Sequence, residues 1–188
     1  MPQQRLGYWQ QVSRLEPHNL VFLDEMGVLL GLMRLLRRAP KGERVYDIKP
    51  FYRGTRVSVI GAISDSKVLA LKALERSLTG EQFKQFLQAD LAPQLWSGAV
   101  VVMDNLPAHK VQGVQDILAQ VGAKALYLSP YSPEFNPIEH WWWELKAFIR
   151  RFVPKTKETL VKLLHLGSRL SSSKTLRNYF AHCCYCAS

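Results

Sequence analysis

Two short apolar runs that each end at an aspartate set the strongest limits on how this 188-residue chain folds. Leu20–Leu23 precedes Asp24, and Ala99–Met103 precedes Asp104. Short runs rich in Val and Leu and bounded by polar or turn residues are typical of buried strands. Each aspartate is therefore expected to close a rigid strand while its carboxylate stays reachable.

The segments around these runs predict a mixed α/β sheet. Residues 56–63 and 67–74 have the pattern of two strands joined by a turn at Ser64–Ser66, and 125–128 that of another strand. Helices are expected over 79–91, 109–121, 136–151 and 157–170. An early hairpin followed by alternating helices and strands favours a mixed five-stranded sheet flanked by helices.

Local signals support the helix starts and one continuous domain. Thr79 and Gln82 form a capping-box pattern, and Asn136 followed by Pro137 is typical of an N-cap and first helical position. We expect a lead-in over residues 1–19, the domain over 20–170 and a C-terminal tail over 171–188.

Charge and composition narrow the class of protein. Lys and Arg number 25 against 15 Asp and Glu, a net charge of +10, which favours polyanions such as nucleic acid, although a soluble protein with a basic surface remains open. The apolar stretch 28–36 is about half a membrane span, so no membrane partner is expected. The three cysteines, clustered in the tail, suit a reducing cytoplasm. Cys183 and Cys186 make only half of a zinc ligand set, which favours free thiols.

Three acids lie at predicted element ends: Asp24, Asp104 and Glu139. Converging carboxylates repel one another unless a cation neutralises them, and such hard oxygen ligands suit Mg²⁺ or Mn²⁺. Each acid also has a structural interpretation. Asp24 and Asp104 stand beside turn residues, and Glu139 falls in the first turn of a helix, where it favours the helix dipole.

The three acidic segments together resemble a known family. They are Leu23–Gly27, Met103–His109 and Leu128–Glu139, with 34 residues between the second and third acids. They resemble the motifs of DDE-superfamily transposases of the mariner-like bacterial insertion-sequence group, from about Leu20 to the C-terminus. The resemblance implies an RNase H-like fold in which Asp24, Asp104 and Glu139 are the catalytic, metal-binding triad.

The resemblance also implies an activity. Two Mg²⁺ or Mn²⁺ ions would support phosphodiester hydrolysis at transposon ends and transfer of the freed 3′-hydroxyl into target DNA, at TA. The implied partners are double-stranded DNA and a second copy in synapsis, in a bacterial cytoplasm near the nucleoid. The 23 residues before Asp24 are too few for the helix-turn-helix region of relatives, so a separately encoded one or a truncated chain is expected.

The sequence leaves the roles of several residues near the three acids open. Asn105 and His109 fall at family-like positions, where His109 is expected either to contact DNA, to tie its loop to the site, or to be structural. Glu25 is left out of the site because strand side chains alternate and it should face away from Asp24. Glu134 competes with Glu139, and the motif favours Glu139.

DNA binding is assigned to basic residues, and the three adjacent indoles leave a second kind of contact open. One cluster is Arg34, Arg37, Arg38, Lys41 and Arg44, and a second, which equally fits a solvated helix face, is Lys146, Arg150, Arg151, Lys155 and Lys157. Trp141, Trp142 and Trp143 point about 100° apart on a helix, so they cannot all face the core. At least one should pack on the sheet, which leaves another available to stack on a base or bind a partner.

Rival functions remain. A ribonuclease H or Holliday-junction resolvase would share the fold and metals, although its flanking motifs would differ. A catalytically inactive remnant that binds DNA without cutting is the other alternative, and the presence of all three acids argues against it.

Overall fold

The computed structural model describes residues 2–33, 38–44, 46, 54–74, 77–130 and 132–185. Within them, five strands form one mixed sheet in the order β3-β2-β1-β4-β5. The strands are β1 (Leu20–Leu29), β2 (Arg56–Ile63), β3 (Val68–Ala73), β4 (Val100–Met103) and β5 (Lys124–Tyr127). β2 pairs antiparallel with both β1 and β3. β4 pairs in parallel with β1 on one side and with β5 on the other. The predicted mixed sheet is confirmed.

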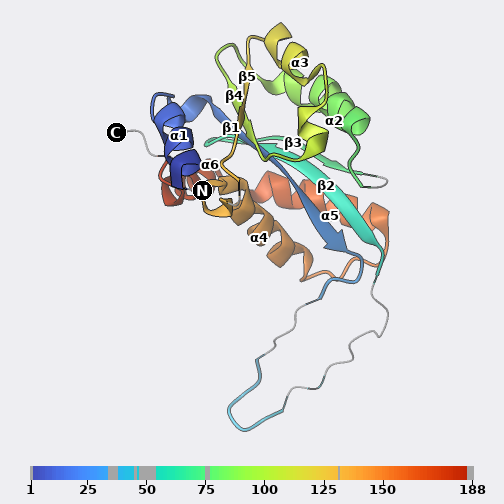
Figure 1. Cartoon of the computed structure of the whole chain (residues 1–188). Coiled ribbons are helices and arrows are strands. Elements are labelled where there is room, and N and C mark those ends of the chain that lie inside the picture. The colour runs from blue at the N-terminus through green and yellow to red at the C-terminus, as the bar shows by residue number, and fades with distance from the viewer. Residues whose placement is uncertain are drawn as a thin grey trace.

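Helices cover both faces of this sheet (Figure 1). They are α1 (Pro2–Val12), α2 (Gly80–Phe86), α3 (Val114–Gln120), α4 (Pro137–Ile149), α5 (Lys157–Leu170) and α6 (Ser173–His182). One hydrophobic cluster lies between the sheet and α1, α4, α5 and α6. A second cluster lies between the opposite face and α2 and α3. None of the described helices is both long and apolar enough to cross a membrane.

The prediction that the first strand ends at Asp24 is wrong, because β1 continues to Leu29. The reason is a change of partner along the strand. Leu20–Phe22 pairs in parallel with β4, and from Phe22 to Leu29 the strand pairs with β2. Asp24 therefore lies in mid-strand, opposite Gly61 of β2, just beyond the end of the parallel ladder.

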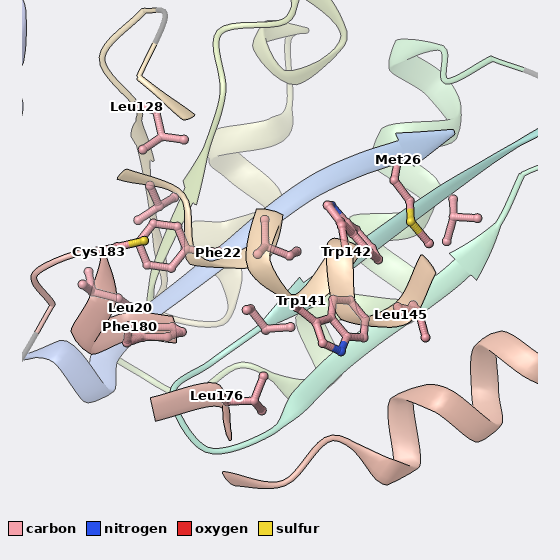
Figure 2. Close-up of a cluster of buried hydrophobic side chains, with 14 of the residues drawn as sticks. Leu20, Phe22, Met26, Leu128, Trp141, Trp142, Leu145, Leu176, Phe180 and Cys183 are labelled. Carbon is pink, nitrogen blue, oxygen red and sulfur yellow. The ribbon is translucent and has the colours of Figure 1, made fainter. Parts of the chain in front are cut away.

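α4 is held on the sheet by two adjacent indoles. Trp141 and Trp142 are 0% and 1% exposed, and they lie together in the cluster between α4 and the strands (Figure 2). An added Cβ at Gly61 would stand only 2.6 Å from Cη2 of Trp142 and 3.2 Å from Cζ3 of Trp141. The indoles thus pack directly on the bare backbone of β2 next to Asp24.

Two helix predictions need correction. The helix expected over 109–121 is divided into a 3-10 turn, Pro107–Lys110, and α3, because Gly113 adopts φ 93° and interrupts the helical backbone. The segment expected over 79–91 begins with the predicted capping box of Thr79 and Gln82, and after α2 it continues as the π-helical turn Leu87–Leu91.

The two ends of the chain meet at the loop before α4. Tyr8 of α1 hydrogen-bonds Tyr185 with the two hydroxyl oxygens 2.6 Å apart, and the Tyr185 hydroxyl donates to the Phe135 carbonyl at 2.7 Å. α6, predicted only as a short tail segment, buries Leu176 and Phe180 in the same cluster (Figure 2). Cys183 is buried and Cys184 exposed, with neither in a disulfide, while Cys186 lies outside the described residues.

We expect Gly61→Ala to destabilise the fold by about 1–3 kcal/mol, because the added methyl group must displace a buried indole. Urea unfolding measures the difference. Gly7→Ala in α1 is the matched control, since no heavy atom lies within 4 Å of its added Cβ, and helix propensity predicts equal or slightly higher stability. Equal stability of Gly61→Ala and wild type would contradict the packing described.

Candidate active site

Asp24 is the most buried of the predicted acids, with 8% of its surface exposed. It shares the α4 face of β1 with Phe22 and Met26, as strand alternation requires. Burial raises the pKa of its carboxyl from 3.8 to about 7, against a lowering hydrogen bond from the Glu25 backbone and with further raising by repulsion from Glu139 and Asp104. The Asn136 amide donates a long hydrogen bond to Asp24 Oδ2 at 3.4 Å.

Asp104 and Glu139 approach Asp24 from two other elements. Asp104 directly follows β4, the neighbour of β1, and Glu139 lies exposed in the first turn of α4. Both carboxylates are near enough to Asp24 for their charges to raise its pKa. The fold thus gathers the three predicted acids in one region at the carboxyl end of β4.

His109 forms a bridge between two carboxylates. Its ring is fully buried, with Nε2 2.8 Å from Oε1 of Glu25 and Nδ1 2.7 Å from Oδ1 of Asp104. The ring also packs on Phe83 of α2, 4.4 Å between centroids. Burial lowers the pKa of His109, but the hydrogen bonds to Asp104 and Glu25 outweigh it and raise the pKa to about 9. His109 is therefore a cation at neutral pH, donating through both nitrogens.

The same bridge acts on Asp104. Partial burial raises the pKa of Asp104, yet the hydrogen bonds from His109 and the Leu106 amide outweigh it, so that the net pKa lies below 3.8. Asp104 is thus ionised while Asp24 is close to its titration point at neutral pH. The pKa values of these two acids are therefore shifted in opposite directions: desolvation raises that of Asp24, and the His109 cation lowers that of Asp104.

A cleft of about 700 Å³ opens on the Glu25 side of the sheet. Its lining includes Glu25, Arg56 and Ser58 from the strands and Leu106 from the segment after β4. The guanidinium of Arg56 lies across Gly27, where an added Cβ would stand 2.3 Å from Nε. The carboxylate that holds His109 therefore borders solvent, and it is reachable from this side.

Asn136 does not cap α4 with its side chain as expected, and Asn105 contacts the residue that follows the neighbouring strand. Asn136 is at the N-cap position of α4, but its side chain makes no capping hydrogen bond. The side-chain amide N–H is directed to Asp24 instead, where it supplies a donor to the buried carboxylate. Asn105 donates to the Leu128 carbonyl at 2.5 Å, which joins the ends of β4 and β5.

The donor set fits a hard divalent cation in its chemistry. Carboxylate oxygens from Asp24, Asp104 and Glu139 are of the type that Mg²⁺ and Mn²⁺ prefer. Asn136 Oδ1 is buried beside Asp24 with no hydrogen-bond partner, an acceptor available to an ion or its water. Among the described residues, however, no group of three or more His, Cys, Asp or Glu side chains is arranged as a ready-made metal site. The three carboxylates thus share one region of the fold, but their side chains are not close enough together to form a metal site as they stand.

The predicted DNA-binding residues are only partly described. Arg38, Lys41, Arg44 and Arg151 are exposed, and Lys146 and Arg150 are half-buried. Arg34 and Arg37 lie outside the described residues. Glu134, the competitor of Glu139, is ion-paired with Arg5 of α1, at the loop where the chain ends meet.

A family model for the DDE superfamily endonuclease matches residues 19–161 of this chain. The chain belongs to this family. The matched span includes all three acids and every strand of the sheet. Among proteins with curated descriptions, none matches the chain.

Solved structures with a similar fold include several of Mos1 transposase. In a pre-cleavage Mos1 transpososome the superposition has a TM-score of 0.72 at 16% identity, covering 95% of this chain and 58% of that one. The Mos1 catalytic domain with raltegravir and Mn has a TM-score of 0.65 at 14% identity, covering 95% and 84%. This chain spans 58% of the first of these proteins, and the likeness establishes the RNase H-like fold that the motifs predicted.

Two residues at the site were missed from the sequence. Glu25 does face away from Asp24 as expected, but on that face it holds His109, 84 residues distant. Asn136 was assigned to capping. The available signal for both was the density of polar residues in otherwise apolar motifs, but only the fold shows which group each one meets.

We expect Asp24→Asn to remove a pH-dependent destabilisation. The folded carboxyl keeps its proton up to about pH 7, whereas the unfolded one loses it near 3.8, so ionisation costs stability increasingly from about pH 4 to 7 and fully above. In EDTA, the variant should gain on the order of 2–4 kcal/mol over wild type across this window, as measured by urea unfolding. Asp65→Asn in the β2–β3 turn is the control. A stability difference between Asp24→Asn and wild type that stays constant from pH 4 to 7 would contradict the raised pKa of Asp24.

We also expect Glu25→Gln to lower the pKa of His109 from about 9 by about one unit or more, because one of its two partner charges is lost. NMR titration of the imidazole protons measures this directly. Glu16→Gln, at an exposed carboxylate before β1, should leave the titration of His109 unchanged. If Glu25→Gln also leaves it unchanged, the bridge is not formed in solution.

Proposed function

We propose that this chain is the catalytic domain of a DNA transposase of the mariner-like bacterial insertion-sequence group. It would hydrolyse the phosphodiester bond at transposon ends and transfer the freed 3′-hydroxyl into target DNA. The observation that carries the proposal is the proximity of Asp24, Asp104 and Glu139, which the motifs single out: burial raises the pKa of Asp24, and the charges of Glu139 and Asp104 raise it further. Membership of the DDE endonuclease family supports it.

Asp24, Asp104 and Glu139 are proposed as the ligands of two Mg²⁺ or Mn²⁺ ions. The ions would supply Lewis-acid activation of the attacking and leaving oxygens. The Mos1 paired-end complexes solved with Mn and with Mg concern a protein of the same fold. Burial raises the pKa of Asp24 to about 7, so a bound cation would stabilise its charged form.

The remaining residues of the site would keep these ligands in place. Asn136 orients Asp24 through its amide and presents its free Oδ1 to the same region. His109 holds Asp104 ionised and fixed in direction, and Glu25 holds His109. A rigid carboxylate held by a buried partner keeps its geometry when the substrate arrives, which is how outer partners tune metal ligands.

The proposed partners are double-stranded DNA, at transposon ends and at a target such as TA, and a second copy of the chain in synapsis. The neighbours of similar fold include a paired-end complex with the left transposon end and a strand transfer complex, both of Mos1. The basic residues Arg38, Lys41, Arg44, Lys146, Arg150 and Arg151 are assigned to phosphate contacts.

We expect Asp104→Asn to reduce cleavage by on the order of a thousandfold, because a metal ligand contributes several kcal/mol to the transition state. The measurement is Mg²⁺-dependent nicking of a plasmid with the inverted repeats that flank the reading frame. Asp116→Asn, an exposed acid in the first turn of α3, is the matched control and should cut like wild type.

The outcomes of this assay separate the alternatives. Equal nicking by wild type and Asp104→Asn would remove Asp104 from the mechanism. Cleavage of an RNA–DNA hybrid or a four-way junction in preference to the repeats would favour a ribonuclease H or resolvase. Binding without any nicking, even with the helix-turn-helix protein added, would favour the inactive remnant.

A further inference from the structure

Helix α4 exposes one indole of its three. Trp141 and Trp142 are buried, whereas Trp143 has 71% of its surface in solvent. Single apolar side chains are common on protein surfaces, so exposure alone indicates nothing. Trp143 is distinguished by its position in the helix relative to Glu139.

Residues four apart on a helix lie on one face, one turn apart. Trp143 therefore stands one turn beyond Glu139, and Lys146 and Arg150 continue the same face at spacings of three and seven from Trp143. Within the described part of the chain, neither Lys146 nor Arg150 forms an ion pair with an acid. Along this face of α4, the acid Glu139 is therefore followed by the indole of Trp143 and then by two cationic side chains.

This order suits a nucleic-acid strand better than a protein. The cations match phosphates, and an indole offers a stacking surface to any base. Cβ atoms one helical turn apart are about 6 Å from each other, so a group bound at the Trp143 ring lies close to Glu139. A protein partner there would block the substrate, whereas the substrate itself would not.

We propose that Trp143 stacks on an unpaired nucleobase next to the scissile phosphate, while Lys146 and Arg150 contact the phosphates that follow. The inference rests on the proposed function, because it places the phosphate at Asp24, Asp104 and Glu139. Trp143 then holds the end of the opened strand in register with the acids. Stacking of this kind tolerates any base, so Trp143 contributes affinity and position and no sequence selectivity.

The test uses the full chain in EDTA and two short duplexes, one blunt and one with a single-stranded 3′ overhang that carries 2-aminopurine. Stacking on an indole quenches 2-aminopurine fluorescence. We expect wild type to quench the overhang probe and Trp143→Ala to lose the quenching, with affinity for the overhang duplex about 5- to 100-fold weaker. Affinity for the blunt duplex should change little.

Two further variants provide controls. Trp143→Phe keeps an aromatic ring and should retain most of the quenching. Leu170→Ala removes another exposed apolar side chain, 64% exposed on α5, and should behave like wild type. Equal quenching and affinity for Trp143→Ala and wild type would overturn the proposal. Loss of self-association in Trp143→Ala by light scattering, with quenching intact, would also overturn it and assign the ring to a second copy.

A parallel cleavage assay with Mg²⁺ keeps this proposal distinct from the proposed function. Quenching that depends on Trp143 in a chain that cuts no DNA supports the stacking and contradicts the transposase activity. Cutting by Trp143→Ala with unchanged KM and unchanged quenching contradicts the stacking and leaves the activity in place.

Discussion

Trp141 and Trp142 pack on the bare backbone of Gly61, and this contact determines where α4 crosses the sheet. Gly61 is the residue opposite Asp24 in the β1–β2 ladder. Because the two indoles meet the sheet there, the start of α4 is carried to the same place, and Asn136 and Glu139 come beside Asp24. The amide partner of Asp24 and its repulsion by Glu139 both depend on this packing contact between a helix and a strand.

On the opposite face of the sheet, charge interactions hold the side chains in place. His109 is fully buried and would be costly there as a cation without compensation. The carboxylates of Glu25 and Asp104 stabilise this cation, and the His109 ring in turn fixes the position of both carboxylates. Within one site, burial thus keeps Asp24 partly protonated, whereas a histidine cation held from the opposite face by Glu25 keeps Asp104 charged. An acid pair of unequal pKa is a common property of catalytic sites.

Much of the fold could be predicted because its signals are local. The run before Asp104, the Ser64–Ser66 turn, the Thr79–Gln82 capping box and the limits of α5 each depend on residues a few positions apart. Predictions failed where distant segments decide. β1 extends past Asp24 because β2 pairs with it, and α6 forms a helix whose Leu176 and Phe180 pack into the core. Gly113 interrupted a helix that the apolar periodicity had favoured.

The sequence alone determined which chemistry is available: three acids in recognisable motifs, a basic chain, and three indoles that cannot all be buried. The tertiary structure decided which groups meet, namely Asn136 with Asp24, and Glu25 with His109 across 84 residues. It also decided that Trp143 is the indole left in solvent. The physical reason is that strand periods, caps and turns act along the chain. Desolvation, charge repulsion and side-chain packing instead depend on distances through space, which only the assembled fold sets.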